Sequence, residues 1–247
     1  MIDPEIVVDE HTHHSPPVHS PNKLLARLPA DDYRRLLPDL ETIHLRAKRV
    51  LLKPHVPVGK IYFLAEGVCS IAQVTADGQM AGVAMVGNEG LVGMAAFGGD
   101  PESGQTAVVE IPDHNAQVMD ARVFYREMNR GTAFKDLIHR YGQAFVESLM
   151  QSVVCNALHP VEKRCARYLL DIRDRVGRND FTLTQEVLAT MLGVRRASVT
   201  LAVGALHRAG LIDHEHKNII IRDLAGLEHA ACECHALVKG HFARLLP

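Results

Sequence analysis

The stretch from Phe181 to Leu211, FTLTQEVLATMLGVRRASVTLAVGALHRAGL, predicts two short helices joined by a tight turn. Thr184 is a suitable N-cap for the first helix, and Gly193 suits its end because glycine readily adopts the left-handed conformation found there. Ala189 is small enough to let the second helix approach closely, and Val199 fills the wedge between the two helices. This spacing is typical of a helix-turn-helix.

The second helix begins with polar and basic residues, and this end of a helix-turn-helix is the one that meets base edges in DNA. Arginine can donate two bonds to guanine, and serine or threonine can bond phosphates. After Gly210, two apolar runs around a polar tip at residues 213–218 predict a two-stranded wing. An ordinary helical hairpin with solvated arginines is the alternative, and the attached wing favours the DNA-binding interpretation. The predicted DNA contacts are Thr184, Gln185, Arg195, Arg196, Ala197, Ser198, Thr200 and Lys217.

The distribution of charge supports a nucleic-acid partner for the C-terminal part of the chain. With 247 residues, the chain is long enough for two domains, and its net charge is −2. Residues 160–222 nevertheless hold 11 Lys and Arg against 7 Asp and Glu, a net charge of +4, whereas residues 1–159 carry −5. Positive charge is therefore concentrated in one C-terminal module.

The N-terminal half shows the pattern of a small β-barrel or jelly roll. Apolar segments at residues 23–40 suit short helices, and short β-like runs punctuated by turn residues follow between His44 and Met119. Asp77-Gly78 lies between two such runs and is a strong hairpin signal. The predicted strands are Ile61–Leu64, Val68–Val74, Met80–Met85 and Gln105–Ile111.

Between residues 121 and 159 the apolar spacing returns to that of a helix. One apolar stripe runs along more than twenty residues, and a helix of this length commonly packs against a twin. We therefore expect a dimer interface here, with burial inside a single chain as the alternative. The predicted interface residues are Phe134, Leu137, Ile138, Tyr141, Phe145, Leu149 and Val153.

From Leu24 to Asp223 the chain resembles the Crp/Fnr family, the regulators related to the cyclic AMP receptor protein and the fumarate-nitrate regulator. The segments Ile61–Gly67 with Asp77-Gly78, and Leu183–Val199, carry the resemblance. It implies an α+β fold with an N-terminal double-stranded β-helix (a β-roll like that of cyclic-nucleotide-binding domains), a long dimerisation helix and a C-terminal winged helix-turn-helix. The corresponding boundaries are a flexible arm at 1–22, the β-roll sensor at 23–120, the dimerisation helix at 121–159, the winged helix-turn-helix at 160–222 and a C-terminal helix at 223–247.

The resemblance implies a sequence-specific transcription regulator, not an enzyme, that binds a pseudo-palindromic operator in double-stranded DNA as a homodimer. RNA polymerase is a further candidate partner. Arg196 matches a base-reading arginine of the family, but Ala197 and Leu201 stand where the cyclic AMP receptor protein has glutamate and a second arginine, so a different operator is expected. The alternative is a sensor module that binds a metabolite or protein without using its helix-turn-helix on specific DNA.

Four residues mark the expected effector pocket, and they depart from the nucleotide-binding pattern of the family. That pattern places a Gly-Glu pair on the ribose and an arginine before Ser/Thr-Ala on the cyclic phosphate. Here the matching positions are Gly93-Met94 and Gln105-Thr106. A buried phosphate needs a cationic or strongly donating partner, which neutral Gln105 does not supply. Cyclic AMP is therefore not predicted as the effector, whose identity stays open.

No cofactor or metal is predicted. The five cysteines, at positions 69, 155, 165, 232 and 234, contain no C-x-x-C pair, and none precedes Cys69, which excludes an N-terminal iron–sulfur site. A single C-terminal helix from Ala225 to Leu246 would point Cys232 and Cys234 in different directions, so packing is favoured over redox or metal sensing. Haem binding by one of the 15 histidines stays open. Without an apolar span or a secretory signal, we expect a cytoplasmic protein.

Overall fold

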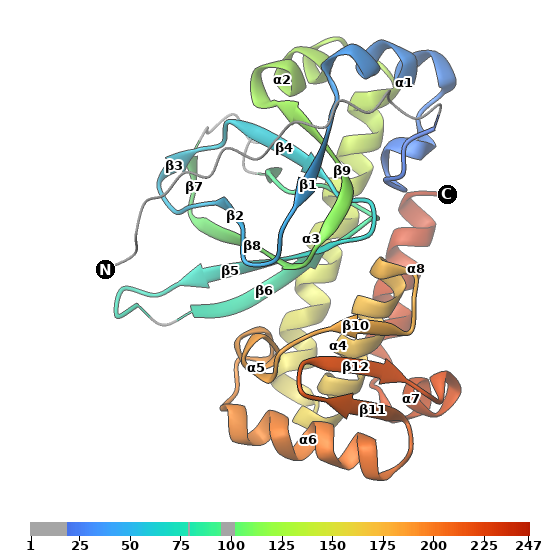
Figure 1. Cartoon of the computed structure of the whole chain (residues 1–247). Helices are drawn as coiled ribbons and strands as arrows, with labels where there is room; N and C mark the ends of the chain where they lie inside the picture. The colour runs from blue at the N-terminus through green and yellow to red at the C-terminus, as the bar shows by residue number, and fades with distance from the viewer. Residues whose placement is uncertain (1–18, 79, 95–101) are drawn as a thin grey trace.

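The N-terminal domain is a β-roll of antiparallel strands, seen in the computed structural model of the chain (Figure 1). The structure describes residues 19–78, 80–94 and 102–247. The main sheets have the strand orders β1-β9-β4 and β2-β8-β5-β6, and β3 pairs with β7. The strands are β1 (Glu41–Leu45), β2 (Val50–Leu52), β3 (Val56–Pro57), β4 (Lys60–Phe63), β5 (Val68–Val74), β6 (Met80–Val86), β7 (Glu102–Ser103), β8 (Gln105–Ile111) and β9 (Asp113–Asp120).

The predicted hairpin is confirmed between β5 and β6. Gly78 has a φ of +82°, and its N–H donates to the carbonyl of Thr75 at 2.9 Å. A second turn, at residues 65–67, depends on β9. The buried carboxylate of Asp113 accepts hydrogen bonds from the backbone N–H groups of Ala65, Glu66 and Gly67. A Cβ at Gly67 would lie 2.6 Å from the Cβ of Asp113, so only glycine fits this position.

The predicted flexible arm at 1–22 needs correction at its end, while residues 1–18 lie outside the described part of the chain. Asn22 is fully buried. Its side-chain amide donates to the carbonyls of Leu64 and Gly90, and its oxygen accepts from the N–H groups of Leu24 and Leu25. The two donated bonds anchor the chain to the β-roll, and the two accepted bonds hold the start of the first short helix. The short helices are η1 (Leu25–Arg27), α1 (Ala30–Leu36) and η2 (Leu37–Asp39).

The predicted helix at 121–159 is two helices, α2 (Ala121–Asn129) and α3 (Ala133–Leu158), because Gly131 turns the chain with a φ of +67°. The first half of α3 packs into the core of its own β-roll, which corrects the predicted interface. Four of its residues are at most 2% exposed within the single chain and are not available to a partner. They are Phe134, Leu137, Ile138 and Tyr141.

The C-terminal domain packs around its own apolar core. It contains α4 (Val161–Val176), β10 (Asp180–Thr182), α5 (Gln185–Leu192), α6 (Arg196–Arg208), β11 (Ile212–Glu215), β12 (Asn218–Ile221), α7 (Leu224–Ala230) and α8 (Cys234–Leu245). Its sheet has the order β10-β12-β11, so β10 forms a third strand beside the two strands of the wing.

The predicted single helix at 223–247 is also wrong, since residues 231–233 separate α7 from α8. From this break, α8 runs back along α3 to the β-roll (Figure 1). Arg244 pairs with Glu147 of α3 at 2.6 Å, and the Arg27 guanidinium donates to the carbonyl of Leu246 at 2.9 Å. The C-terminal segment therefore connects the C-terminal domain to both α3 and the β-roll.

The two domains also touch directly where β6 meets α5. A Cβ at Gly82 would lie 2.7 Å from the Cα of Met191, so the absence of a side chain at Gly82 lets the strand pack directly against the helix. Nearby, Arg175 of α4 pairs with Glu89 of the β-roll at 2.9 Å. The N-terminal and C-terminal domains thus share a packed boundary.

Among the described residues, no single helix is long and apolar enough to cross a membrane. Taken together, α5 and α6 have the length and apolar composition of a span, but the two helices are bent by 110° where they meet.

Candidate nucleic-acid interface

The geometry of α5 and α6 is that of a helix-turn-helix. Gly193 adopts a left-handed φ of +61° at the end of α5, and the N–H of Val194 donates to the carbonyl of Ala189 at 3.1 Å. Val199 is fully buried between the helices. The predicted roles of the small residue, the turn glycine and the wedge are confirmed.

The start of α5 is held by the predicted cap. The Thr184 hydroxyl oxygen accepts a hydrogen bond from the N–H of Val187 at 3.2 Å, which satisfies one of the free donors of the helix terminus. The next residue, Gln185, accepts at its side-chain oxygen a 2.7 Å hydrogen bond from the Thr200 hydroxyl. Two predicted DNA-contact residues from different helices are therefore held together, with the Gln185 amide group still free to donate.

The outer face of α6 is basic at its start. Arg195 is the N-cap, Arg196 is the first helical residue, and both are exposed. Within the described part of the chain, neither guanidinium has a hydrogen-bond or ion-pair partner, so both can donate to an external acceptor. Ala197 is exposed beside them, and Ser198 is half-buried.

Sequence reasoning did not include Leu201 among the contact residues. Its side chain is 69% exposed, and it lies one helical turn beyond Ala197, on the same face of α6 as that residue. Apolar side chains in a recognition helix contact the methyl group of thymine. The signal available in the sequence was a leucine one helical turn beyond Ala197, among the polar and basic residues at the start of the second helix.

The wing is confirmed as β11 and β12, with His216 and Lys217 at its tip. His216 adopts a left-handed φ of +56°, and the exposed Lys217 lies at the end of the hairpin. The Leu183 N–H donates to the Lys217 carbonyl at 2.7 Å, which ties the wing tip to the start of the helix-turn-helix.

Comparison with known proteins agrees with this geometry. Residues 163–230 match the family model of the Crp-like helix-turn-helix domain. The chain therefore contains a Crp-like helix-turn-helix domain. No curated protein matches the sequence of this chain.

Solved structures share the fold of this chain over both domains. A CRP-family transcriptional regulator from Thermus thermophilus is 21% identical with a TM-score of 0.63, covering 76% of this chain and 95% of that one. FixK2 from Bradyrhizobium japonicum is 15% identical with a TM-score of 0.62, covering 78% and 98%. The c-di-GMP responsive global regulator CLP from Xanthomonas campestris is 15% identical with a TM-score of 0.61, covering 78% and 99%.

The expected effector residues occupy two places in the β-roll. Gly93 has a φ of +120°, and Met94 beside it lines a hollow against α3. Gln105 and Thr106 begin β8 and pair with Gln73 and Ala72 of β5. The segment between these places, residues 95–101, lies outside the described residues.

Proposed function

We propose that the regulator binds a pseudo-palindromic operator as a homodimer, with Arg196 reading guanine in the major groove. The observation that carries this proposal is the unpartnered, exposed guanidinium at the start of α6, within a family-matched helix-turn-helix. Arg195 directly precedes it, and Lys217 at the wing tip and the Gln185 amide at the start of α5 offer further donors to phosphates. DNA that enters this surface would meet base-reading and backbone-binding groups together.

The second half of α3 supports a dimer formed by two copies of this chain. Five apolar side chains on this part of the helix are 45–73% exposed in the single chain. They are Val146, Met150, Val153, Val154 and Leu158. A second copy of the same stripe would cover them, and a two-fold arrangement would present two recognition helices to two half-sites about one helical turn apart.

The effector pocket supports a ligand other than cyclic AMP. Met94 and Gln105 offer no charge to a ribose or a cyclic phosphate, and a phosphate desolvated without a cation is costly. The regulator therefore responds to a different signal, with RNA polymerase as a candidate partner on DNA.

Selection of bound fragments from random DNA, with and without cell extract, tests the proposal. Enrichment of one pseudo-palindromic motif supports specific reading, and a change with extract reports an effector. Salt-sensitive binding without any enriched motif would instead support a sensor module whose helix-turn-helix does not read sequence.

A further inference from the structure

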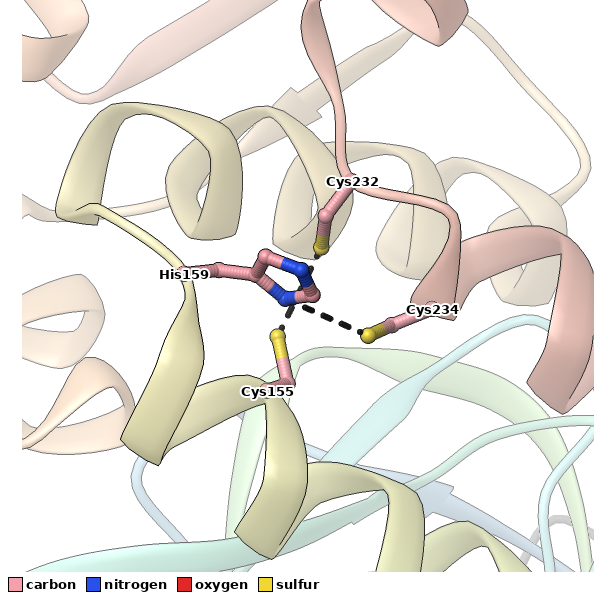
Figure 2. Close-up of side chains that lie close together, drawn as sticks. All are labelled: Cys155, His159, Cys232 and Cys234. Carbon is pink, nitrogen blue, oxygen red and sulfur yellow. Dashed lines mark hydrogen bonds between the residues drawn. The ribbon is translucent and has the colours of Figure 1, made fainter.

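Four potential metal ligands converge at the C-terminal end of α3. Figure 2 shows the side chains of Cys155, His159, Cys232 and Cys234 turned toward one another. Cys155 lies in the last turn of α3 and His159 directly follows that helix, whereas Cys232 and Cys234 come from the break between α7 and α8. Their ligand atoms all lie within 4.8 Å of one another.

The closest distances match those of a tetrahedral ion site. Cys155 Sγ lies 3.5 Å from Cys232 Sγ, and Cys234 Sγ lies 3.5 Å from His159 Nδ1. With Zn–S bonds of about 2.3 Å and a Zn–N bond of about 2.0 Å, two ligand atoms of a tetrahedron lie about 3.5–3.8 Å apart. Ligand atoms that lie up to 4.8 Å apart would need to approach one another by only about 1 Å to share one ion.

Neighbouring groups orient these ligands as an outer shell does in zinc proteins. His159 faces Cys234 with Nδ1, and its Nε2 lies 3.2 Å from a carboxylate oxygen of Glu233. A carboxylate on the far nitrogen fixes the histidine tautomer in many zinc sites. The Gln151 amide donates to Cys234 Sγ at 3.1 Å, a bond that suits a thiolate.

Buried positive charge lies beside the thiols. Arg164 and Arg167 of α4 are only 7% and 8% exposed, and the Nε atom of each has no hydrogen-bond partner among the described residues. A divalent ion with three thiolates and a neutral histidine carries a net charge of −1, which these guanidinium groups would offset.

Simple apolar packing does not account for this cluster. Buried cysteines usually behave as small hydrophobic side chains within a larger core. Cys155, Cys232 and Cys234 instead form a separate group, outside both apolar cores, and they contact polar and charged side chains. In contrast, Cys165 lies within the apolar core of the C-terminal domain and shows the ordinary behaviour.

We propose that Cys155, His159, Cys232 and Cys234 bind one zinc ion, or another divalent ion that prefers thiolates, and that this ion fastens α8 to the end of α3. Four protein ligands complete a tetrahedron, so the site is closed and structural rather than catalytic. Arg164 also donates a hydrogen bond to the carbonyl of Leu192, the last residue of α5. The ion would therefore hold together the junction from which the helix-turn-helix extends.

Metal content and cobalt spectroscopy of the full chain test the proposal. Protein purified with a non-thiol reductant should contain about one zinc per chain. Replacement by Co²⁺ should give the visible bands of tetrahedral cobalt and a thiolate charge-transfer band of the intensity expected for three thiolates. Cys234→Ser should lower that intensity by about one third or abolish binding, and His159→Gln should shift the visible bands while retaining all three thiolates.

Cys165→Ser is the matched control, because this cysteine is equally buried but lies outside the cluster. It should retain one cobalt per chain with the wild-type spectrum. The proposal is overturned if the reduced wild-type chain takes up no stoichiometric zinc or cobalt, or if Cys165→Ser loses the ion as Cys232→Ser does. A chain that forms a Cys155–Cys232 disulfide and binds no ion would identify a redox pair instead.

Discussion

At the residue scale, Arg196 is expected to determine the base preference of the regulator. A bidentate contact to guanine discriminates by roughly 1–3 kcal/mol, and both protomers of a dimer would make it. Arg196→Ala should therefore weaken operator binding by about 2–6 kcal/mol and relax the preference at one guanine in each half-site. Binding titrations of the variant against the operator and its single-base variants measure both the loss of affinity and the change in base preference. An equal loss on every sequence would show that Arg196 acts only through its charge.

Arg195 provides the matched comparison at the neighbouring position. As the N-cap of α6 it lies nearer the turn, where phosphate is the nearer acceptor. Arg195→Ala should lower affinity on all sequences alike and reduce the slope of log K against log salt by about 1 for each phosphate that the variant no longer neutralises. A specific loss at one base pair would assign Arg195 to base reading instead.

Met94 and Gln105 lead to a prediction about the effector. Neither side chain supplies the charge that would hold a ribose and a cyclic phosphate. Calorimetry with millimolar cyclic AMP should show no saturable heat. A dissociation constant in the low micromolar range would contradict the prediction, and the same titration with other nucleotides extends the test.

At the scale of elements, the exposed stripe on α3 is the expected dimer interface. Met150→Glu would place two carboxylates in an apolar, two-fold contact, which should weaken dimerisation by about 3 kcal/mol or more. Sedimentation equilibrium should show a folded monomer. Val56→Glu, at an exposed valine of β3, serves as the control and should leave the mass unchanged.

Phe145 is less suitable for that test, although it belongs to the predicted interface. Its ring is half-buried against its own β-roll and lies 6.0 Å from the ring of Tyr141. A charge at this position would disturb folding of the single chain as well as dimerisation. An unchanged dimer mass for Met150→Glu would place the interface on another face of the molecule.

At the scale of the whole molecule, α8 connects the DNA-binding module, α3 and the β-roll, so the proposed ion should stabilise the entire assembly. An ion present at about 1,000 times its dissociation constant adds about 4 kcal/mol to the free energy of unfolding. For a chain of this size, chelation should lower the melting temperature by on the order of 10 °C. Calorimetry with and without chelator measures the shift, and added zinc should restore it. Cys232→Ser should melt at the same temperature under both conditions.

Much of the DNA-binding module follows from local sequence. The Thr184 cap, the left-handed Gly193 and the buried Val199 depend on residues a few positions apart, and such interactions are encoded in spacing. The hairpin at Asp77-Gly78 was predictable for the same reason. The turn between α5 and α6 and the basic start of α6 could therefore be predicted without the structure.

Only the tertiary structure decided which apolar residues remain for a partner and where the cysteines meet. Periodicity shows that α3 has an apolar stripe, but not that its first half enters its own β-roll while Met150 and Val153 stay exposed. Cys155 and Cys232 are separated by 77 positions. Their thiols meet because the helical structure is interrupted after α7 and α8 then returns along α3. Local spacing sets which way a side chain points along its own element, whereas the path of the whole chain sets which elements meet.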